Sequence, residues 1–385
     1  MIRAQLAPTQ SASWALAFCG GRHDREVILQ GLRSELGEIA IVGGAAVGTI
    51  TNNSLGYSGY ECSVAAFPAS VPKPIIVTVE GLRAGELEAG QQLGAKLRDV
   101  THEGDTVLLF YDSIQAGPPP VLYVGSRLME GLYQGLGSQP LKLIGAGTVG
   151  DFGLTNSYVF DGHQGIKHAV VAAVLPSIVQ SHTTIMHGCM PVSSFLEITR
   201  IEGAILYELE GRPALDVLSE MTGQRAGQPA ADNLSLAITI GEKHGDLYAP
   251  YDESAYVNRL ILGSNPTDGS VTLFEADFKV GTKVQIMLRD NQVMLESVQK
   301  RTRQLLAALD HEKPIFALYV DCAGRSSAFS GAELEEASLL QAELGLELPL
   351  LGFYSGVEIA PLLGRSRPLD WTGVLTLFTL LPERG

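Results

Sequence analysis

The stretch Trp14-Ala15-Leu16-Ala17-Phe18, followed by a helical pattern and by Ile41-Val42-Gly43-Gly44-Ala45-Ala46-Val47-Gly48, decides the fold because its order of elements occurs three times. Each copy has a strand, a helix, a second strand with a glycine turn, and a strand-like tail. The first copy ends at 62–67, the second has strands at 107–111, 144–151 and 169–175, and the third has them at 316–320, 351–358 and 374–378. Three spaced copies are too few for a solenoid. We therefore predict duplicated α/β modules inside a globular protein.

The strands of these copies are continuous apolar runs rather than alternations of apolar and polar residues. Such runs are typical of strands that are covered on both faces. Helix signals lie between them: N-terminal capping residues at Asp24, at Ser126 and at Ser330 with Glu333, and C-terminal glycines at Gly37, Gly135 or Gly137, and Gly345. The predicted fold class is α/β (mixed α+β), with mixed sheets covered by helices.

The region between the second and third copies has a different character. Residues 195–201 and 204–209 predict a β-hairpin, and Pro213 is typical of the first turn of a helix. Short β runs then follow, separated by glycine turns, and a polar helix is predicted at about 290–309. We predict two domains, 1–195 with two module copies and 196–385 with the antiparallel region and the third copy. A boundary at about residue 225 is the alternative.

Composition narrows the classes of function. The 385 residues carry a formal net charge of −15 and no basic run, which disfavours a nucleic-acid partner. The four cysteines lie far apart in the sequence and form no CxxC pair, so neither a zinc knuckle nor a redox dithiol is indicated. No apolar run approaches ~20 residues, the length of a membrane-spanning helix. We expect a soluble, cytoplasmic protein without membrane insertion.

Three stretches are unusual enough to indicate a family: 198–214, His187-Gly188-Cys189-Met190-Pro191, and Gly352-Phe353-Tyr354-Ser355-Gly356-Val357-Glu358-Ile359-Ala360-Pro361. They resemble the FIST proteins (F-box and intracellular signal transduction). The resemblance covers nearly the whole chain and implies a FIST N-type and a FIST C-type domain. It also implies a ligand-binding sensory module of bacterial signalling, and some members are similar to haem-binding nitric oxide sensors that control a histidine kinase.

The chain departs from the family pattern at the glycine turns, where the family commonly has a second glycine followed by an acid. Copy one keeps Gly48 but has Thr49 in the acidic place, copy two keeps Gly150 and Asp151, and copy three has Val357 before Glu358. The family's Cys-x-Gly-Arg-Gly loop is present as Cys322-Ala323-Gly324-Arg325-Ser326, with Ser326 in the place of the last glycine. These changes affect the identity of a ligand more than they affect the fold.

Acids just past buried strand ends are candidates for binding the amine of a small ligand, which singles out Asp151 and Glu358. Arg325, near a predicted helix N-terminus, is a candidate for binding a carboxylate, with Cys322 beside it in the loop. Tyr354 would supply a pocket wall. The alternatives are a turn or cap hydrogen bond for the acids, an ion pair with a surface acid for Arg325, and core packing for Tyr354.

Other chemistries have weaker signals. His187 would be the axial ligand if the protein held haem, but no CxxCH attachment site is present, so we expect no cofactor. Cys189 with His187 could form a nucleophile and base, yet no orienting acid is evident. The glycine turns lack a helix directly behind them, which disfavours nucleotide binding.

The function we predict is that of a sensory protein which binds a small ligand, such as an amino acid, in a cleft between modules. It would signal in trans to a protein partner, such as a histidine kinase or another receptor component. The alternatives are a haem-binding nitric oxide sensor, an enzyme acting on a small metabolite, and a scaffold that binds no metabolite.

Overall fold

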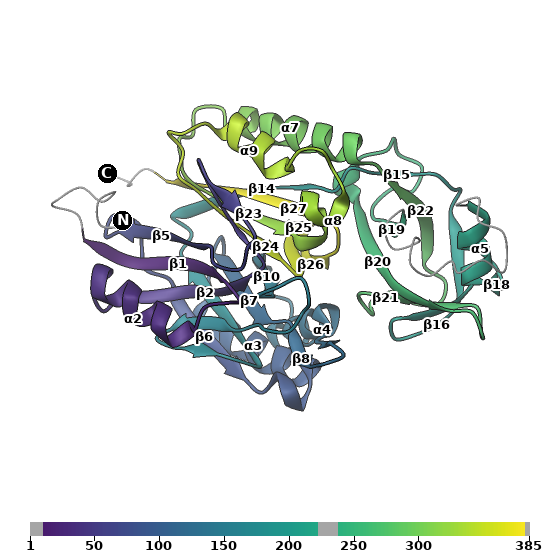
Figure 1. Ribbon diagram of the computed structural model, residues 1–385, viewed down its shortest axis with the longest axis horizontal. Coiled ribbons are helices and arrows are strands. Elements are labelled where there is room, and N and C mark those ends of the chain that lie inside the picture. The colour runs from purple at the N-terminus through teal and green to yellow at the C-terminus, as the bar shows by residue number, and fades with distance from the viewer. Residues whose placement is uncertain (1–10, 222–237, 382–385) are drawn as a thin grey trace.

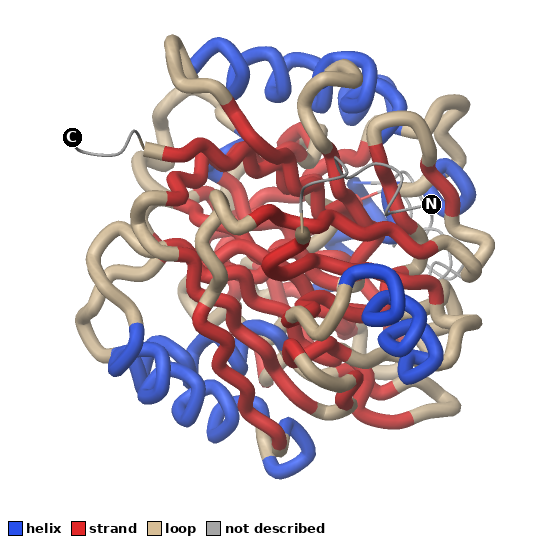
Figure 2. The backbone as a smooth tube through the Cα atoms, turned by 90° about the vertical axis from the view of Figure 1, so that its left-hand side faces the viewer, coloured by secondary structure: helices blue, strands red, loops and turns tan. Residues whose placement is uncertain are grey.

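The computed structural model describes residues 11–221 and 238–381. A body of stacked sheets occupies one side of the molecule and an antiparallel barrel the other (Figure 1). In the body the helices lie around the outside of the strands (Figure 2). The predicted α/β class with mixed sheets and an antiparallel region is confirmed.

The three predicted modules are present and share one topology. In each, the first strand is parallel to the second and antiparallel to the tail. The strands, in that order, are β1 (Ala12–Gly20), β2 (Ala40–Ala46) and β5 (Cys62–Pro68); β7 (Thr106–Asp112), β10 (Lys142–Thr148) and β13 (Ala169–Leu175); and β23 (Pro314–Cys322), β24 (Leu350–Ser355) and β27 (Gly373–Leu380). Even the register repeats, because Gly43, Gly145 and Gly352 stand opposite Ala17, Leu109 and Tyr319.

The hairpin that follows each second strand joins the sheet of another module. The hairpin of copy one, β3 (Thr49–Thr51) and β4 (Leu55–Gly56), pairs with β24 of copy three. That of copy three, β25 (Val357–Leu362) and β26 (Arg365–Leu369), pairs with β10 of copy two. That of copy two, β11 (Val159–Gly162) and β12 (Gly165–Ile166), pairs with β2 of copy one. This cyclic exchange joins the three modules into one body.

Two of the three sheets have a further strand beside the tail. It is β6 (Ile75–Glu80) next to β13, and β14 (Val179–Met186) next to β27. In the first module β5 pairs only with β1 within the part of the chain that the structure describes. The helices of the body are α2 (Arg25–Leu36), α3 (Glu86–Val100), α4 (Gly125–Leu136), α7 (Asn291–Ala308), α8 (Ser327–Ser330) and α9 (Glu336–Leu344), and a small hairpin is formed by β8 (Ile114–Ala116) and β9 (Val121–Leu122).

The barrel lies in the chain between β14 and α7. Its strands follow one another around the ring as β22 (Lys283–Arg289), β16 (Leu196–Glu202), β17 (Ile205–Leu209), β21 (Ser270–Leu273), β20 (Tyr256–Asn265) and β19 (Ile238–Lys243), and β19 pairs again with β22. The short strands β15 (Cys189–Pro191) and β18 (Arg212–Pro213) adjoin it, and α5 (Ala214–Met221) follows β18. The predicted hairpin and the helix after Pro213 are both confirmed.

Strand exchange affects how the two predicted domains are described. Strands from 1–195 and from 196–385 share sheets, since β3 lies beside β24 and β25 lies beside β10. The third module therefore belongs to the same body as the first two, and 196–289 is the part that forms the barrel. The exact boundary, at residue 195 or near 225, stays a prediction.

The helix N-cap predicted in the first module is confirmed, and the one predicted in the third module is not. The Asp24 carboxylate accepts hydrogen bonds from the backbone N–H groups of Glu26 (2.9 Å) and Val27 (3.1 Å), as predicted. The predicted capping box at Ser330 is wrong, because Ser330 ends α8 and the next helix begins at Glu336. Gly331 follows α8 with a left-handed backbone conformation, at φ 70°. This conformation ends α8 and lets the chain change direction before the next helix.

Aromatic side chains fill the space between the sheets. The rings of Phe18 and Phe353 stack with centroids 3.7 Å apart, and Phe110 contacts both edge-on. Each of these residues comes from a different module and is fully buried. The core is thus shared among the copies, which makes each one depend on the others for burial.

Residues 11–221 and 238–381 also contain the short 3₁₀ helices η1 (Leu82–Ala84), η2 (Glu253–Ala255) and η3 (Ala323–Arg325). The last two carry residues of the candidate site: η3 follows directly on β23 and η2 precedes β20.

Candidate functional site

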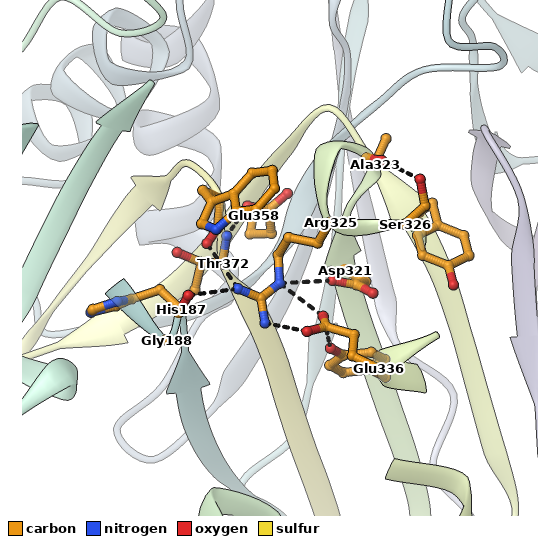
Figure 3. Close-up of polar contacts among 12 residues, drawn as sticks. His187, Gly188, Asp321, Ala323, Arg325, Ser326, Glu336, Glu358 and Thr372 are labelled. Carbon is orange, nitrogen blue, oxygen red and sulfur yellow. Dashed lines mark hydrogen bonds and ion pairs between the residues drawn. The ribbon is translucent and has the colours of Figure 1, made fainter. Parts of the chain in front are cut away.

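Arg325 is the centre of a buried polar cluster at the end of β23 (Figure 3). Its side chain is fully buried, its Nε donates to Glu336 Oε1 (2.8 Å) and its Nη2 donates to Glu336 Oε2. Its Nη1 donates to the backbone oxygens of His187 (2.9 Å) and Trp371 (3.2 Å). Every nitrogen of the guanidinium therefore has a partner within the protein, and a ligand carboxylate would have to displace Glu336.

More carboxyl groups than guanidinium groups are buried at this point. Asp321 Oδ1 lies 3.4 Å from Arg325 Nε, and Tyr319 donates to Glu336 Oε1 (2.8 Å). Burial, and after it the charge of Glu336, raises the pKa of Asp321 well above its ordinary value. Among these groups, burial therefore favours the protonated form of Asp321.

Tyr354 joins the same region through another acid. Its hydroxyl donates to Glu335 Oε2 (2.9 Å), and Tyr57 of the first module donates to Glu335 Oε1 (2.8 Å). The backbone N–H of Ser327 donates to the same oxygen at 2.7 Å. Glu335 thus ties the loop after β4, the strand β24 and the start of α8 together.

Glu358 and Cys322 are buried beside this cluster. The Glu358 carboxyl accepts hydrogen bonds from Ser355 Oγ (2.8 Å) and from the backbone N–H of Thr372 (3.3 Å). Burial raises the pKa of Glu358, and it also raises the pKa of the Cys322 thiol. The structure therefore brings Cys322, Arg325, Tyr354 and Glu358 together, as the sequence predicted, but in a packed interior.

Asp151 has a different environment. Its carboxylate accepts hydrogen bonds from Thr155 N (3.2 Å), Thr155 Oγ1 (2.7 Å) and Asn156 N (3.2 Å), which is the turn arrangement that the sequence left open as an alternative.

The strand pairing shows which residues are equivalent in the three modules. Thr49 stands opposite Phe353, Glu358 opposite Ala146, and Val159 opposite Gly44. These three partners each follow the shared glycine of their strand.

The register therefore corrects the alignment of the three turns. Val159, not Asp151, occupies the position in copy two that Thr49 and Glu358 occupy in the other copies. Asp151 belongs to the longer loop between β10 and β11. Counting residues from the glycine could not reveal this, because only pairing across the sheet shows where the loop is longer.

His187 is buried between β14 and β15 with both ring nitrogens in use. Its Nε2 lies 2.9 Å from the backbone oxygen of Glu253, and its Nδ1 accepts a hydrogen bond from Cys189 N (2.9 Å). Burial lowers the pKa of His187, which favours the neutral ring. This arrangement does not fit an axial ligand of haem, because neither nitrogen is directed to an open coordination position.

The cysteine nucleophile finds no support in the geometry of the same segment. Cys189 is fully buried and burial raises the pKa of its thiol to about 11. A thiol of that kind is largely protonated near neutral pH, whereas a catalytic cysteine reacts as the thiolate. Among the described residues no group of His, Cys, Asp and Glu side chains is arranged to hold a metal ion.

A cavity of about 280 Å³ lies between the body and the barrel. Helix α4 supplies Arg127, Glu130 and Tyr133, a barrel loop supplies Asp277 and Lys279, and strand β26 supplies Arg365 and Arg367. A neighbouring hollow of about 600 Å³ shares Glu130, Tyr133 and Arg365 with it. Ligand sites commonly form at such junctions.

The lining of this cavity is cationic although the whole chain is acidic. Arg365 and Arg367 are two residues apart on β26, and such residues lie on one face of a strand. The guanidinium of Arg365 lies over the ring of Tyr133, 4.1 Å from its centroid. Within the described residues the buried Nε of Arg367 has no hydrogen-bond partner. The sequence signal was the pair Arg365 and Arg367, which we did not single out.

Buried carboxylates bond the barrel to the wall of this cavity. Glu275 accepts hydrogen bonds from the N–H groups of Gly125 (3.1 Å) and Ser126 (2.7 Å), the first residues of α4. Burial, followed by the charge of Asp370, raises the pKa of Glu275 to about 8. Asp370 in turn accepts from Leu260 N (3.1 Å) of β20. The position of the barrel and that of α4 are therefore directly linked.

The geometry can now be compared with known proteins. The FIST N domain model matches residues 13–212 and the FIST C domain model matches residues 214–361. The chain belongs to the FIST family. FIST domains are sensory domains of signal transduction, so the predicted family and its general role are both supported.

Curated relatives of this FIST protein come from mycobacteria. A protein of Mycobacterium tuberculosis, described as uncharacterized, is 26% identical over 261 residues, which span 68% of this chain and 66% of the relative. One of Mycobacterium bovis, with the same description, is 28% identical over 223 residues, which span 57% of this chain and 56% of the relative.

Within the described residues of the FIST protein, the helices are too short or too polar to cross a membrane.

Proposed function

We propose that this FIST protein is a sensor that binds a small carboxylate ligand, with free amino acids as the first candidates, between the body and the barrel. The observation that carries the proposal is the cationic cavity formed by Arg127, Lys279, Arg365 and Arg367. A planar guanidinium pairs with a carboxylate through parallel hydrogen bonds. Arg367 lines the cavity, and its buried Nε has no hydrogen-bond partner among the described residues.

Size and charge favour an amino acid within that class. A cavity of about 280 Å³ is at the small end for ligand sites, which commonly measure about 300–1,000 Å³. Glu130, on the exposed side of α4, offers a carboxylate for the ligand ammonium group. Asp277 is held by Arg259, whose Nε donates to Asp277 Oδ1 (2.8 Å), so we assign the ammonium to Glu130.

The cavity also suggests how binding would become a signal. Its walls come from the body and from the barrel, so a ligand that contacts both favours one arrangement of the two parts. The output would act in trans on a protein partner, for which a histidine kinase or another receptor component is the working candidate.

Binding rather than catalysis is proposed because Cys189 and Cys322 are buried thiols with raised pKa values.

Thermal unfolding with a panel of free amino acids and other small carboxylates tests the proposal. A ligand at 100 times its dissociation constant should stabilise the protein by about 2.7 kcal/mol. Arg367→Ala should abolish that shift, whereas Arg303→Ala should keep it, because Arg303 is exposed on α7 and pairs with Glu343. The proposal fails if no carboxylate shifts the wild type, or if both variants respond alike.

Haem remains a separate candidate that an absorption spectrum tests. Protein incubated with haem should show no Soret band that depends on His187, since both ring nitrogens of His187 are bonded within the protein. A band that His187→Ala removes would favour the gas-sensor alternative instead.

A further inference from the structure

Cys19 and Cys62 face each other across neighbouring antiparallel strands. Cys19 is the eighth residue of β1 and stands directly opposite Cys62, the first residue of β5. Directly opposite residues of an antiparallel pair have Cα atoms about 4.5 or 5.5 Å apart, and disulfides span about 4.4–6.8 Å. The two Sγ atoms are in contact in the structure, and both residues are free cysteines.

The two thiols have unlike surroundings. Cys62 is exposed at the start of an edge strand, whereas Cys19 is fully buried. The two thiols share one hydrogen bond in which either sulfur can be the donor. This contact lowers the pKa of Cys62, and the same contact followed by burial raises the pKa of Cys19. The nucleophilic form, the thiolate, is thus favoured at Cys62, the exposed residue of the pair.

We propose that Cys19 and Cys62 form an oxidisable dithiol, with hydroperoxides as the oxidant class, which closes to an intramolecular disulfide. Nothing in the ligand cavity takes part in this chemistry, so it is independent of the proposed sensory function. Cys62 is the attacking residue and Cys19 the resolving residue.

The reaction balances as two steps. The Cys62 thiolate attacks one peroxide oxygen, the O–O bond breaks, a sulfenic acid forms, and the departing hydroxide takes up a proton and leaves as water. Cys19 Sγ then attacks Cys62 Sγ, the S–O bond breaks, and the second hydroxide leaves as water with the Cys19 proton. Two thiols lose two electrons and two protons, and hydrogen peroxide, the simplest oxidant of this class, is reduced to two waters.

A disulfide at this position would change one edge of the body. β5 pairs only with β1 among the strands that the structure describes, and the link joins the first residue of β5 to β1. The remaining cysteines, Cys189 and Cys322, are buried in other clusters and serve as internal controls. Oxidation should therefore be confined to one pair.

The test is titration of the reduced full chain with hydrogen peroxide, followed by thiol alkylation, denaturation and peptide mass spectrometry. We expect a Cys19–Cys62 crosslinked peptide, reversed by a thiol reductant, while Cys189 and Cys322 remain alkylatable after denaturation. In Cys19→Ser we expect a Cys62 sulfenic acid that a dimedone probe traps, and no crosslink. Cys189→Ser should form the crosslink as the wild type does.

Three results would overturn the proposal. One is oxidation of Cys189 or Cys322 before Cys62 in folded protein. Another is a disulfide between two chains in place of the intramolecular link. The third is a Cys62 that reacts with peroxide no faster than the buried cysteines in both the wild type and Cys19→Ser. Because the readout is covalent, it does not depend on any carboxylate binding to the cavity.

Discussion

At the scale of single residues, the cluster around Arg325 shows what buried charge does in this protein. Arg325 and Glu336 are both fully buried and joined by two hydrogen bonds, with the carboxyl group of Asp321 as a third buried neighbour. Removing one partner of such a pair leaves the other without compensation, which costs about 3–5 kcal/mol. The cluster therefore makes the end of β23 sensitive to single substitutions.

We predict that Arg325→Met lowers the free energy of unfolding by about 3–5 kcal/mol. Glu343→Gln is the control, because its pair with Arg303 lies at the surface, where ion pairs contribute about 0–1 kcal/mol. Urea unfolding monitored by tryptophan fluorescence measures both variants. Equal unfolding midpoints for Arg325→Met and Glu343→Gln would show that the buried cluster has no special role.

The sequence identified some residues of this cluster and not their partners. Arg325 and Glu358 follow the ends of β23 and β24, and Tyr354 lies in the last two residues of β24. Such positions converge at one edge of a sheet. Glu336 gave no comparable signal, because on a helix it looks like any other acid until the tertiary packing places it against Arg325. Tertiary contacts, rather than local pattern, decide which acid of a helix is buried.

At the scale of elements, α3 and α4 approach each other more closely than side chains would allow. A Cβ added at Gly94 would lie 2.0 Å from Leu132 O, and one added at Gly131 would lie 2.0 Å from Leu87 O. Gly90 and Gly135 make equally close approaches, so each helix has two glycines four residues apart at the contact. Glycine at these positions allows the two helices to pack closely, although each glycine lowers the stability of its own helix.

We predict that Gly94→Ala destabilises the protein, because the added methyl group meets the backbone of α4 and the two helices must separate. An overpacked site of this kind costs about 1–3 kcal/mol. Gly31→Ala is the matched control: no atom lies within 4 Å of its added Cβ, and α2 should gain about 0.5–1 kcal/mol. Thermal unfolding of both variants should therefore move in opposite directions, and a shift of the same sign would contradict the packing argument.

The modules were predictable from sequence and their exchange was not. In each module a strand, a helix and a glycine-containing strand follow one another along the chain. The periodicity of apolar residues predicts such consecutive elements. The exchanged hairpins are different. In copy one, β3 and β4 are only two to three residues long, and β3 pairs with β24, about 300 positions away in the chain. All three modules present a similar free edge, so pattern alone could not choose among them.

At the scale of the whole molecule, the carboxylate of Glu253 joins the barrel to the body at the two chain connections between them. Glu253 of η2 accepts hydrogen bonds from the N–H groups of His187 (3.1 Å) and Gly188 (3.0 Å), on the link between β14 and β15. Ser297 Oγ (2.7 Å) and Arg301 Nε (2.7 Å) of α7 donate to its other oxygen. Both connections between barrel and body therefore meet at this side chain.

The charge of Glu253 is maintained against its burial. Burial alone would raise the pKa of Glu253, but His187, Arg301, the Gly188 N–H and Ser297 outweigh it and lower the pKa from 4.5 to about 2. An acid with a lowered pKa stabilises the fold above its unfolded value, and that contribution is lost as the pH falls from 4.5 toward 2. His187 acts in the same direction, because burial lowers its pKa below 6.5 while the unfolded chain takes up the proton.

We predict that acid weakens the wild type more than Glu253→Gln. The shift of the Glu253 pKa corresponds to about 3 kcal/mol, lost between about pH 5 and pH 2, and the variant lacks this loss. Urea unfolding at stepped pH measures it, with Glu296→Gln, exposed on α7, as the control for removing one charge. The wild type and Glu296→Gln should share one pH profile and Glu253→Gln should have a flatter one. Three parallel profiles would mean that Glu253 is not the ionised link between barrel and body.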